Sequence, residues 1–233
     1  MATTKRLKNK IAPRKAGRVA RKSKGKPARV RLDMGERRTQ LLDLGIDLFS
    51  KHGYDDISID SLAEEAGISK GLLYHYFGSK REYYVATVKA ASLHLQRLTV
   101  PDPSLPPAAR LAAAVDKHLR YVDEHRAVFV AMYRSGAAVA PEVNKIIEAH
   151  RDVVMRYFLE GIGVSTPRPM LRTSLRAWIA MVEGASLDWI SHPAITRDQL
   201  RDLLVAGYVA MLAKTFEMDP ETAQAITRPA RAV

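Results

Sequence analysis

From about residue 32 onward, apolar residues in this chain recur with the 3.6-residue period of an α-helix. The alternation of apolar and polar residues that marks a β-strand is absent from this stretch. Glycine and proline fall between the periodic segments, where they interrupt helices. The pattern predicts an all-α protein of about nine helices, at residues 36–52, 59–66, 70–76, 79–98, 107–125, 126–135, 141–160, 168–191 and 197–217.

The excess of basic residues is concentrated in the first 31 residues. This arm holds 13 lysines and arginines and no acidic residue, whereas the remaining 202 residues hold 24 basic and 25 acidic side chains. Few large apolar side chains and mutual charge repulsion predict that the arm, 1–31, is disordered when free. The net charge of +12 therefore describes a near-neutral globule with a basic N-terminal arm.

Composition excludes several classes of protein. The chain has no cysteine, which removes disulfide frameworks, cysteine nucleophiles and thiolate zinc sites. No apolar run reaches the roughly 18 residues that a membrane span requires. No apolar segment follows the basic N-terminus as it does in a secretory signal. A basic transit peptide remains an alternative interpretation of the arm, although the regular Leu/Phe stripe of an amphipathic helix is missing.

The most informative stretch is residues 58–80, with the sequence SIDSLAEEAGISKGLLYHYFGSK. Ser58 and Ser69 are placed to cap two short helices. Gly67 allows a tight turn between them. Two such helices make a helix-turn-helix, whose second helix can lie in the major groove of DNA.

Basic and hydroxyl side chains on the outward face of this unit suit contact with DNA. Lys70 and Lys80 can meet phosphates, and the hydroxyl groups of Ser58, Ser69 and Tyr74 can donate to phosphate oxygens. Lys80 also opens the helix at 79–98, where backbone amides favour a phosphate. The module as a whole is acidic, because residues 32–80 hold five basic and nine acidic side chains. Its DNA face must therefore be a local basic patch.

The order of these motifs resembles the TetR family of bacterial transcription regulators over about residues 36–96. The matching segments are Lys51-His52-Gly53-Tyr54, Ile57-Ser58-Ile59, Leu62-Ala63, Ala66-Gly67-Ile68-Ser69-Lys70-Gly71, Leu73-Tyr74-His75-Tyr76-Phe77 and Ser79-Lys80. Tyr76 departs from the family, which most often has histidine or another aromatic residue there. The resemblance implies a dimer, a helical C-terminal domain that binds a small ligand, and ligand-controlled release from a double-stranded DNA operator. It also implies a bacterial cytoplasmic protein that is associated with the nucleoid when bound.

By position, the resemblance implies DNA contacts from Arg38, Thr39, Ser58, Ser69, Lys70, Gly71, Leu72, Tyr74, His75 and Lys80. His75 has the alternative of a surface histidine without a role. The expected organisation is a three-helix helix-turn-helix DNA-binding domain at 32–80, a larger helical ligand-binding and dimerisation domain at 81–217, and a frayed tail at 218–233. The arm is expected to add sequence-independent attraction to phosphates, with a solvated tail or a start-site artefact as the alternative.

The sequence predicts neither an enzyme nor a bound metal or cofactor. It contains no His-Glu-x-x-His and no phosphate-binding P-loop. Gly161 and Gly163 follow a helix rather than a strand, so they do not form a dinucleotide-binding loop. His118 and His125 lie seven residues apart on one helix face but lack a third ligand at suitable spacing.

The helices between residues 107 and 190 are rich in polarizable and aromatic side chains, which suit an adaptable apolar cavity. Candidate ligand contacts, each with the alternative of a simple core residue, are Tyr121, Phe129, Met132, Met155, Phe158, Trp178 and Met181. Polar candidates for orienting a ligand head group are His118, His150, Arg151 and Glu183. The expected effector is apolar or amphipathic.

Helices 168–191 and 197–217 carry apolar stripes that are broader than one core requires. The resemblance implies that they pair with their twofold mates in a four-helix bundle. Gly207 and Ala210 permit close helix approach. The helix at 79–98 joins the DNA-binding unit to the pocket, so a ligand that tilts it changes the spacing of the two recognition helices.

Three functions compete for this sequence. The first is a dimeric, ligand-responsive repressor that is released from a palindromic operator. The second is an architectural DNA-coating protein dominated by its arm, which predicts little sequence preference and no ligand. The third is an enzyme on a helical scaffold, which the missing catalytic motifs disfavour. Whether transcription is repressed or activated does not follow from the chain.

Overall fold

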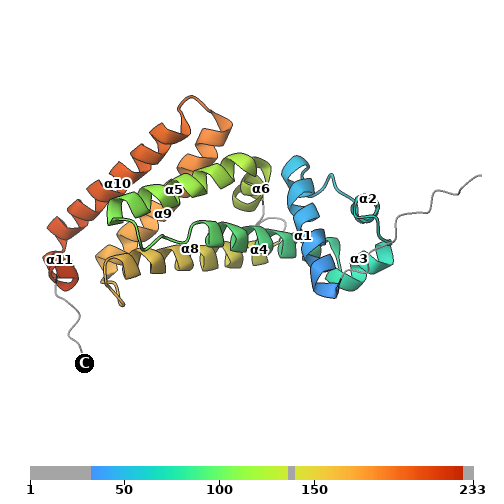
Figure 1. The fold of residues 1–233 in the computed structure, drawn as a ribbon, viewed down its shortest axis with the longest axis horizontal. Helices are drawn as coiled ribbons and strands as arrows, with labels where there is room; N and C mark the ends of the chain where they lie inside the picture. Colours follow the sequence, from blue (N-terminus) through green and yellow to red (C-terminus); the bar gives the residue numbers. More distant parts are fainter. Residues whose placement is uncertain (1–32, 136–139, 228–233) are drawn as a thin grey trace, which may run out of the picture.

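The computed structural model describes residues 33–135 and 140–227, and every regular element within these ranges is a helix. The molecule is elongated, with the helices formed by residues 34–77 at one end (Figure 1). The all-α prediction is therefore confirmed. None of the described helices is both long and apolar enough to cross a membrane. The basic arm, 1–31, lies outside the described residues.

The three N-terminal helices are α1 (Met34–Lys51), α2 (Ile59–Glu65) and α3 (Lys70–Phe77). Ser58 and Ser69 cap α2 and α3 as predicted, because each hydroxyl oxygen accepts a hydrogen bond from a backbone amide of the first turn. Gly67 has a φ of +61° in the turn between these helices, a left-handed conformation that favours glycine. The helix-turn-helix predicted from residues 58–80 is present.

The helix α4 (Lys80–Leu98) runs from this end into the larger domain, and Ser79 caps it. A connector rich in proline leads to α5 (Pro107–Glu124). The remaining elements are α6 (Arg126–Val130), the π-helical turn η1 (Ala131–Ser135), α8 (Glu142–Gly161), α9 (Pro169–Ser191), α10 (Arg197–Met218) and α11 (Pro220–Thr227). In this domain α10 packs against α5 and α9, and α8 packs against α4 and α9.

The C-terminal segment differs from the predicted frayed tail, because residues 220–227 form α11. Arg168, at the start of α9, pairs with Asp219 (Nε to Oδ2, 3.1 Å) and Glu221 (Nη1 to Oε2, 2.7 Å). Asp219 also accepts a 2.7 Å hydrogen bond from the Thr222 hydroxyl. These contacts fix the first turn of α11 beside the start of α9. Such long-range ion pairs leave no periodic signal in the sequence.

One apolar core continues from the helix-turn-helix end into the larger domain. Phe49 of α1 belongs to the same buried cluster as Phe129 of α6 and Val143 of α8. A second buried cluster lies among α5, α8, α9 and α10 and includes Leu175 and Leu204. The first cluster therefore joins the helix-turn-helix end to the helices that surround the second.

Helices α1 and α4 approach each other closely at Gly45. A β-carbon on this residue would lie 2.5 Å from Oγ1 of Thr87 and 2.7 Å from Oη of Tyr83. The Tyr83 hydroxyl donates a hydrogen bond to the carbonyl oxygen of Leu41 in α1. Burial raises the pKa of Tyr83 well above its ordinary value, so the hydroxyl remains a donor. The glycine contact and this hydrogen bond fix α1 against α4.

Candidate functional site

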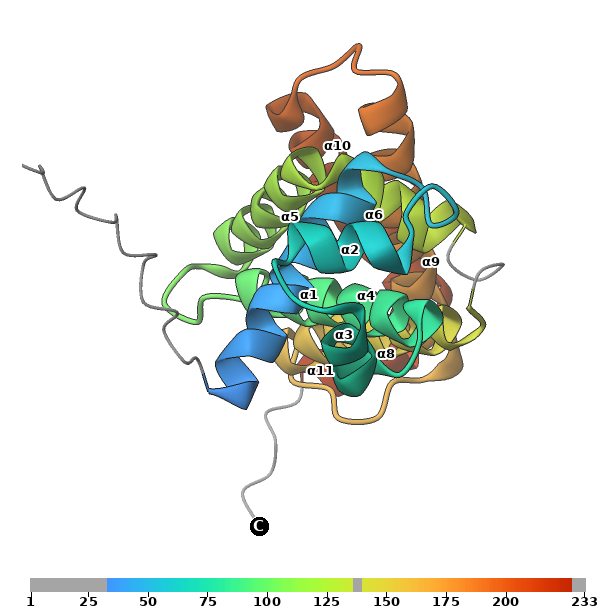
Figure 2. The ribbon, with the colours of Figure 1, turned by 90° about the vertical axis from the view of Figure 1, so that its right-hand side faces the viewer.

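The outward face of α3 lies at the end of the molecule, beside α2 and α1 (Figure 2). Leu72 and Tyr74 are 38% and 41% exposed although both are large. His75 is exposed too, and a β-carbon on Gly71 would meet no described atom within 4 Å. Leu73, on the opposite face, is buried. The helix therefore presents a mixed polar and apolar surface that can enter a DNA groove.

Both lysines that are predicted to bind phosphates, Lys70 and Lys80, contact other side chains of the chain. Lys70 Nζ lies 2.9 Å from Oδ2 of Asp60, and both side chains are exposed. The hydrogen bond to Asp60 raises the pKa of Lys70. Lys80 Nζ lies 4.2 Å from the centroid of the Tyr54 ring, which is a cation–π contact. Lys70 must leave Asp60, or share it, before it can neutralise a phosphate.

The other predicted DNA contacts also belong to α1, α2 and α3 or to their caps. The guanidinium carbon of Arg38 lies 5.2 Å from the centroid of the Phe77 ring. The Thr39 hydroxyl donates a 3.1 Å hydrogen bond to a backbone carbonyl of α1. Ser58 and Ser69 use their hydroxyl oxygens as helix caps, and both residues are exposed. Both hydroxyl groups therefore already have a structural role.

A cavity of about 380 Å³ lies inside the larger domain. Helices α5, α8, α9 and α10 supply its walls, and Thr99 and Pro101 of the connector after α4 reach one end. This volume falls within the range of small-molecule sites. The apolar lining includes Leu111, Val115, Val154, Phe158, Trp178, Ile179, Val182, Val205, Tyr208 and Leu212.

Of the seven aromatic and methionine side chains predicted to contact ligand, only Phe158 and Trp178 line this cavity, and the polar candidates His118, His150 and Glu183 line it too. Tyr121, Phe129 and Met132 surround a separate void of about 10 Å³ among α4, α5 and α6, which is too small for an effector. Residue type and helical period predict that those three side chains are buried. Neither criterion tells which buried face borders a cavity and which is packed.

The two remaining predicted contacts also lie away from the cavity lining. Met155 is buried in the cluster formed by α5, α8, α9 and α10. Met181 is 41% exposed, and its Cε lies 2.9 Å from the point where a β-carbon of Gly207 would stand. Gly207 thus allows α9 and α10 to approach within one subunit by leaving room for the Met181 side chain.

Polar side chains gather at one end of the cavity, where His118, Tyr133, His150 and Glu183 line it. Nε2 of His118 lies 3.2 Å from Oγ of Ser186. Nδ1 of His150 is buried and has no hydrogen-bond partner among the described residues. Desolvation lowers the pKa of His118 to about 3 and that of His150 to about 4. Both imidazole groups are therefore uncharged near neutral pH.

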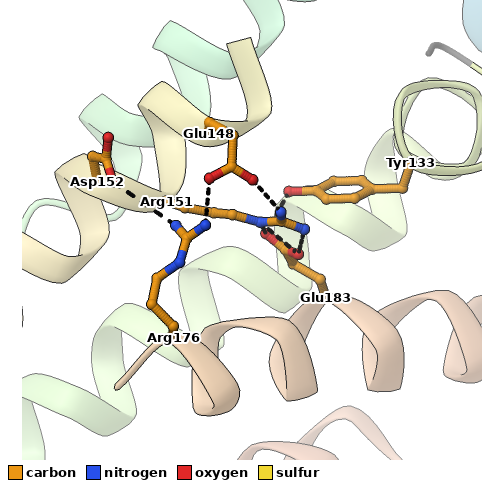
Figure 3. Close-up of polar contacts among 6 residues, drawn as sticks. All are labelled: Tyr133, Glu148, Arg151, Asp152, Arg176 and Glu183. Atoms are coloured by element: carbon orange, nitrogen blue, oxygen red, sulfur yellow. Dashed lines mark hydrogen bonds and ion pairs between the residues drawn. The ribbon is translucent and has the colours of Figure 1, made fainter. Parts of the chain in front are cut away.

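An ion-pair network holds Glu183 at this polar end (Figure 3). Nε of Arg151 lies 3.0 and 3.1 Å from the two carboxylate oxygens, and the Tyr133 hydroxyl donates to Oε1 at 3.1 Å. Arg151 Nη1 also contacts Oε1 of Glu148 at 2.6 Å, and Arg176 pairs with the other oxygen of Glu148. The charges of Glu183, Arg151 and Glu148 at this polar end are thus each compensated by a neighbour of opposite sign.

Burial of His150 should make stability depend on pH. The unfolded chain takes up a proton near pH 6.5, whereas folding lowers the pKa of His150 to about 4. The resulting stability is present above pH 6.5 and is lost as the pH falls towards 4. Between pH 7 and pH 5, wild type should lose about 2 kcal/mol more unfolding free energy than His150→Phe. Urea unfolding at both pH values measures this difference, with the exposed His94→Phe as a control that should follow wild type.

Sequence reasoning missed most of the lining residues, and Tyr133 and Arg110 are two of them that carry polar groups. Tyr133 lies four residues after Phe129, and their rings are 4.7 Å apart, so helical spacing could have placed them together. Arg110 lies eight residues, or about 12 Å of helix, before His118 on α5. Its Nη2 donates to the carbonyl oxygens of Pro103 and Leu105, both at 3.0 Å, which ties the connector to α5.

Comparison with known proteins places both halves of the chain. Residues 41–87 match the family described as bacterial regulatory proteins, tetR family, and residues 107–211 match the tetracyclin repressor-like C-terminal domain. The HTH-type transcriptional activator FasR of Mycolicibacterium smegmatis is 30% identical over 59% of this chain and 66% of its own length. The HTH-type transcriptional regulator HbdR of Aromatoleum sp. is 32% identical over 62% of this chain and 58% of its own length.

The chain thus spans about three fifths to two thirds of the length of these two curated relatives. A crystal structure of a tetR-family transcriptional regulator from Streptomyces coelicolor superposes with a TM-score of 0.77 at 33% identity, over 84% of this chain and 88% of that one. The matched segments contain the helix-turn-helix and the domain with the cavity. This chain therefore belongs to the TetR family of transcriptional regulators, with a DNA-binding helix-turn-helix formed by α2 and α3.

Proposed function

We propose that this chain is a ligand-responsive, sequence-specific repressor that leaves a palindromic operator when a small apolar or amphipathic effector fills the cavity. The observation that carries the proposal is the position of the cavity at one end of α4. Thr99, the C-cap of α4, lines the cavity, whereas the start of α4 packs on the helix-turn-helix. A 19-residue helix, about 28 Å long, therefore connects the two sites.

A second connection between cavity and DNA-binding domain runs through α6 and η1. Helix α6 packs against α1, and Tyr133 of η1 donates its hydrogen bond to Glu183 at the polar end of the cavity. Arg81 of α4 and Glu142 of α8 form an ion pair of 2.6 Å near the same boundary. A ligand that favours one arrangement of these contacts over another changes the populations of two domain spacings.

The outward face of α3 is the proposed DNA-reading surface. Breaking the Lys70–Asp60 ion pair tests this proposal. Asp60→Asn should strengthen operator binding about threefold to tenfold at low salt, because it frees Lys70 and removes a negative charge near the phosphates. Titration across a series of salt concentrations should show a steeper loss of affinity than in wild type. Glu64→Gln is the matched control, because it removes an exposed acidic charge from the same helix and Lys70 pairs with Asp60 instead. Equal gains in both variants would refute a specific role for the pair.

A homodimer through α9 and α10 is also proposed, because both helices expose an apolar stripe. On α9 the exposed small or apolar residues are Ala177, Ala180, Met181 and Gly184. On α10 they are Leu203, Ala206, Ala210 and Ala213. Their spacing of three and four residues is the seam of a helix bundle. A twofold interface would bury the same stripe on both subunits.

Leu203, which is 62% exposed, provides the test of this interface. Leu203→Glu should weaken dimerisation at least tenfold, because it places two carboxylates beside the twofold axis. Sedimentation equilibrium should then show monomer at concentrations where wild type is dimeric. Val100→Glu, a change at a 47% exposed residue of the connector, should leave the dimer intact. An unchanged association constant in Leu203→Glu would exclude this face.

The proposed function as a whole is tested by selecting bound fragments from the genomic DNA beside the gene. A repressor should protect a palindrome with half-sites one helical turn apart and should prefer it over random DNA by at least roughly 1,000-fold. A small molecule that fills the cavity should release that DNA. An architectural protein dominated by the arm would instead bind both DNAs equally and would ignore ligands.

A further inference from the structure

At the polar end of the cavity, His118 has a hydrogen-bond partner and Nδ1 of His150 has none among the described residues. His150 is 6% exposed, and its buried Nδ1 has no partner among the described residues. A buried polar side chain without a partner is unfavourable, and a ligand that pairs with the imidazole of His150, which lines the cavity, gains affinity. His118, in contrast, already has Ser186 within hydrogen-bond distance. His150 is therefore the polar group of this end that a ligand can satisfy.

The charges near His150 restrict what that ligand can be. The carboxylate of Glu183 is engaged by Arg151 through two nitrogen atoms and also by Tyr133, so it offers no free anion for an amine. Arg151 is in turn shared between Glu183 and Glu148, so it offers no free cation for a carboxylate. Figure 3 shows that these groups point at one another. A charged ligand group placed here would be buried without a partner.

The two imidazole groups supply no charge either. Desolvation keeps His118 and His150 neutral, and the nearby Arg151 further lowers the pKa of His150. A neutral imidazole nitrogen can donate or accept one hydrogen bond, depending on its tautomer. Its natural complement is an uncharged group such as a hydroxyl or a carbonyl.

We infer that the effector of this cavity is an apolar molecule with an uncharged hydrogen-bonding group, a hydroxyl or a carbonyl, that pairs with the imidazole of His150. This inference rests on the proposed function and names the chemical class of its effector. The apolar skeleton lies along Leu111, Val154 and Phe158, between the polar end and the connector. Arg110 lines the cavity as well, about 12 Å from His118 along α5. The buried Nε of Arg110 lacks a partner among the described residues. It defines the competing arrangement, in which an anion lies on Arg110.

Three probes with one ten-carbon chain separate these arrangements: 1-decanol, decylammonium and decanoate. The chain has two tryptophans, and Trp178 lines the cavity. In the full-length Trp189→Phe variant, Trp178 fluorescence reports binding directly. We expect 1-decanol to bind at least tenfold more tightly than either charged probe, because neither charge finds a partner beside His150. Tightest binding by decanoate, equal affinities, or no binding by 1-decanol would overturn the inference.

Adding His150→Phe to this reporter keeps an aromatic ring and removes both ring nitrogens. Its affinity for 1-decanol should fall about threefold to tenfold, the loss of one hydrogen bond. Affinity for the two charged probes should not change. The thermal midpoint of the free variant at pH 7 should equal or exceed that of the reporter, since an unpaired buried nitrogen has been removed. His94→Phe, outside the cavity, should change none of these values, and an equal affinity loss there would overturn the assignment to His150.

Failure of this inference is distinguishable from failure of the proposed function. Operator DNA released by another small molecule, while the three probes bind alike, would leave the repressor function intact and overturn only the effector class. Selective binding of 1-decanol by a protein that shows no preference for operator DNA would support the effector class and overturn the repressor function. Both measurements use the same full-length protein.

Discussion

Tyr74→Ala should lower the affinity for operator DNA roughly 100-fold, because a dimer presents α3 twice and each lost contact weakens binding by about 1.4 kcal/mol. Tyr74 is 41% exposed on the outward face of α3, so its removal should leave the fold unchanged. The salt dependence of binding should stay as in wild type, since no cation is removed. Fluorescence anisotropy with a labelled operator measures both quantities.

The matched control is Leu93→Ala, which removes a 42% exposed side chain from α4. This variant should bind operator as wild type does. Tyr74→Phe, which retains the ring, separates stacking from the hydroxyl contact. An operator affinity of Tyr74→Ala within threefold of wild type would remove α3 from the DNA-reading surface.

Arg151→Met should lower the free energy of unfolding by about 2–4 kcal/mol, the cost of leaving a buried carboxylate without its cation. The Glu183 side chain is 7% exposed and Arg151 is 25% exposed, so this ion pair is mostly shielded from water. Because the Arg151 side chain keeps a quarter of its surface exposed, this expected loss of stability lies slightly below that for a fully buried ion pair. Urea unfolding at pH 7 measures the loss, and Arg201→Met, which removes an arginine paired only with exposed carboxylates, should cost less than 1 kcal/mol.

The double variant Arg151→Met/Glu183→Gln distinguishes an unpaired charge from lost packing. The neutral amide can still accept the hydrogen bond from Tyr133. The double variant should therefore regain at least half of the stability that Arg151→Met loses. If both variants were equally unstable, the loss would come from the packing of the arginine side chain and not from its charge.

Local patterns predicted the helix-turn-helix end well. Ser58, Gly67 and Ser69 act through neighbours three or four residues away, so the caps and the turn are determined by short stretches of chain. The residues that contact DNA remain predictions, because the exposure of Tyr74 and His75 identifies a surface and not a ligand. The Lys70–Asp60 pair joins residues ten positions apart on two helices, and sequence spacing did not indicate it.

The cavity was much less predictable. Phe158 and Trp178 were expected there and line it, but Met155 and Phe129 have the same apolar character and are packed elsewhere. Burial follows from helical periodicity, whereas a cavity depends on how four helices fail to fill the space between them. Its polar end unites residues from four separate elements, and Tyr133 among them was not identified from sequence.

The contact at Gly45 determines how motion passes through the molecule. The backbone of α1 rests directly against the side chains of Thr87 and Tyr83 on α4, without room for even a methyl group. Close-packed interiors have low compressibility, so this helix–helix contact allows little relative movement. We expect a tilt of α4 to move α1 with it, because this contact leaves little room for rotamer changes. We therefore expect α4 and α1 to move together, and Thr99, the C-cap of α4, lines the cavity at the far end of this unit.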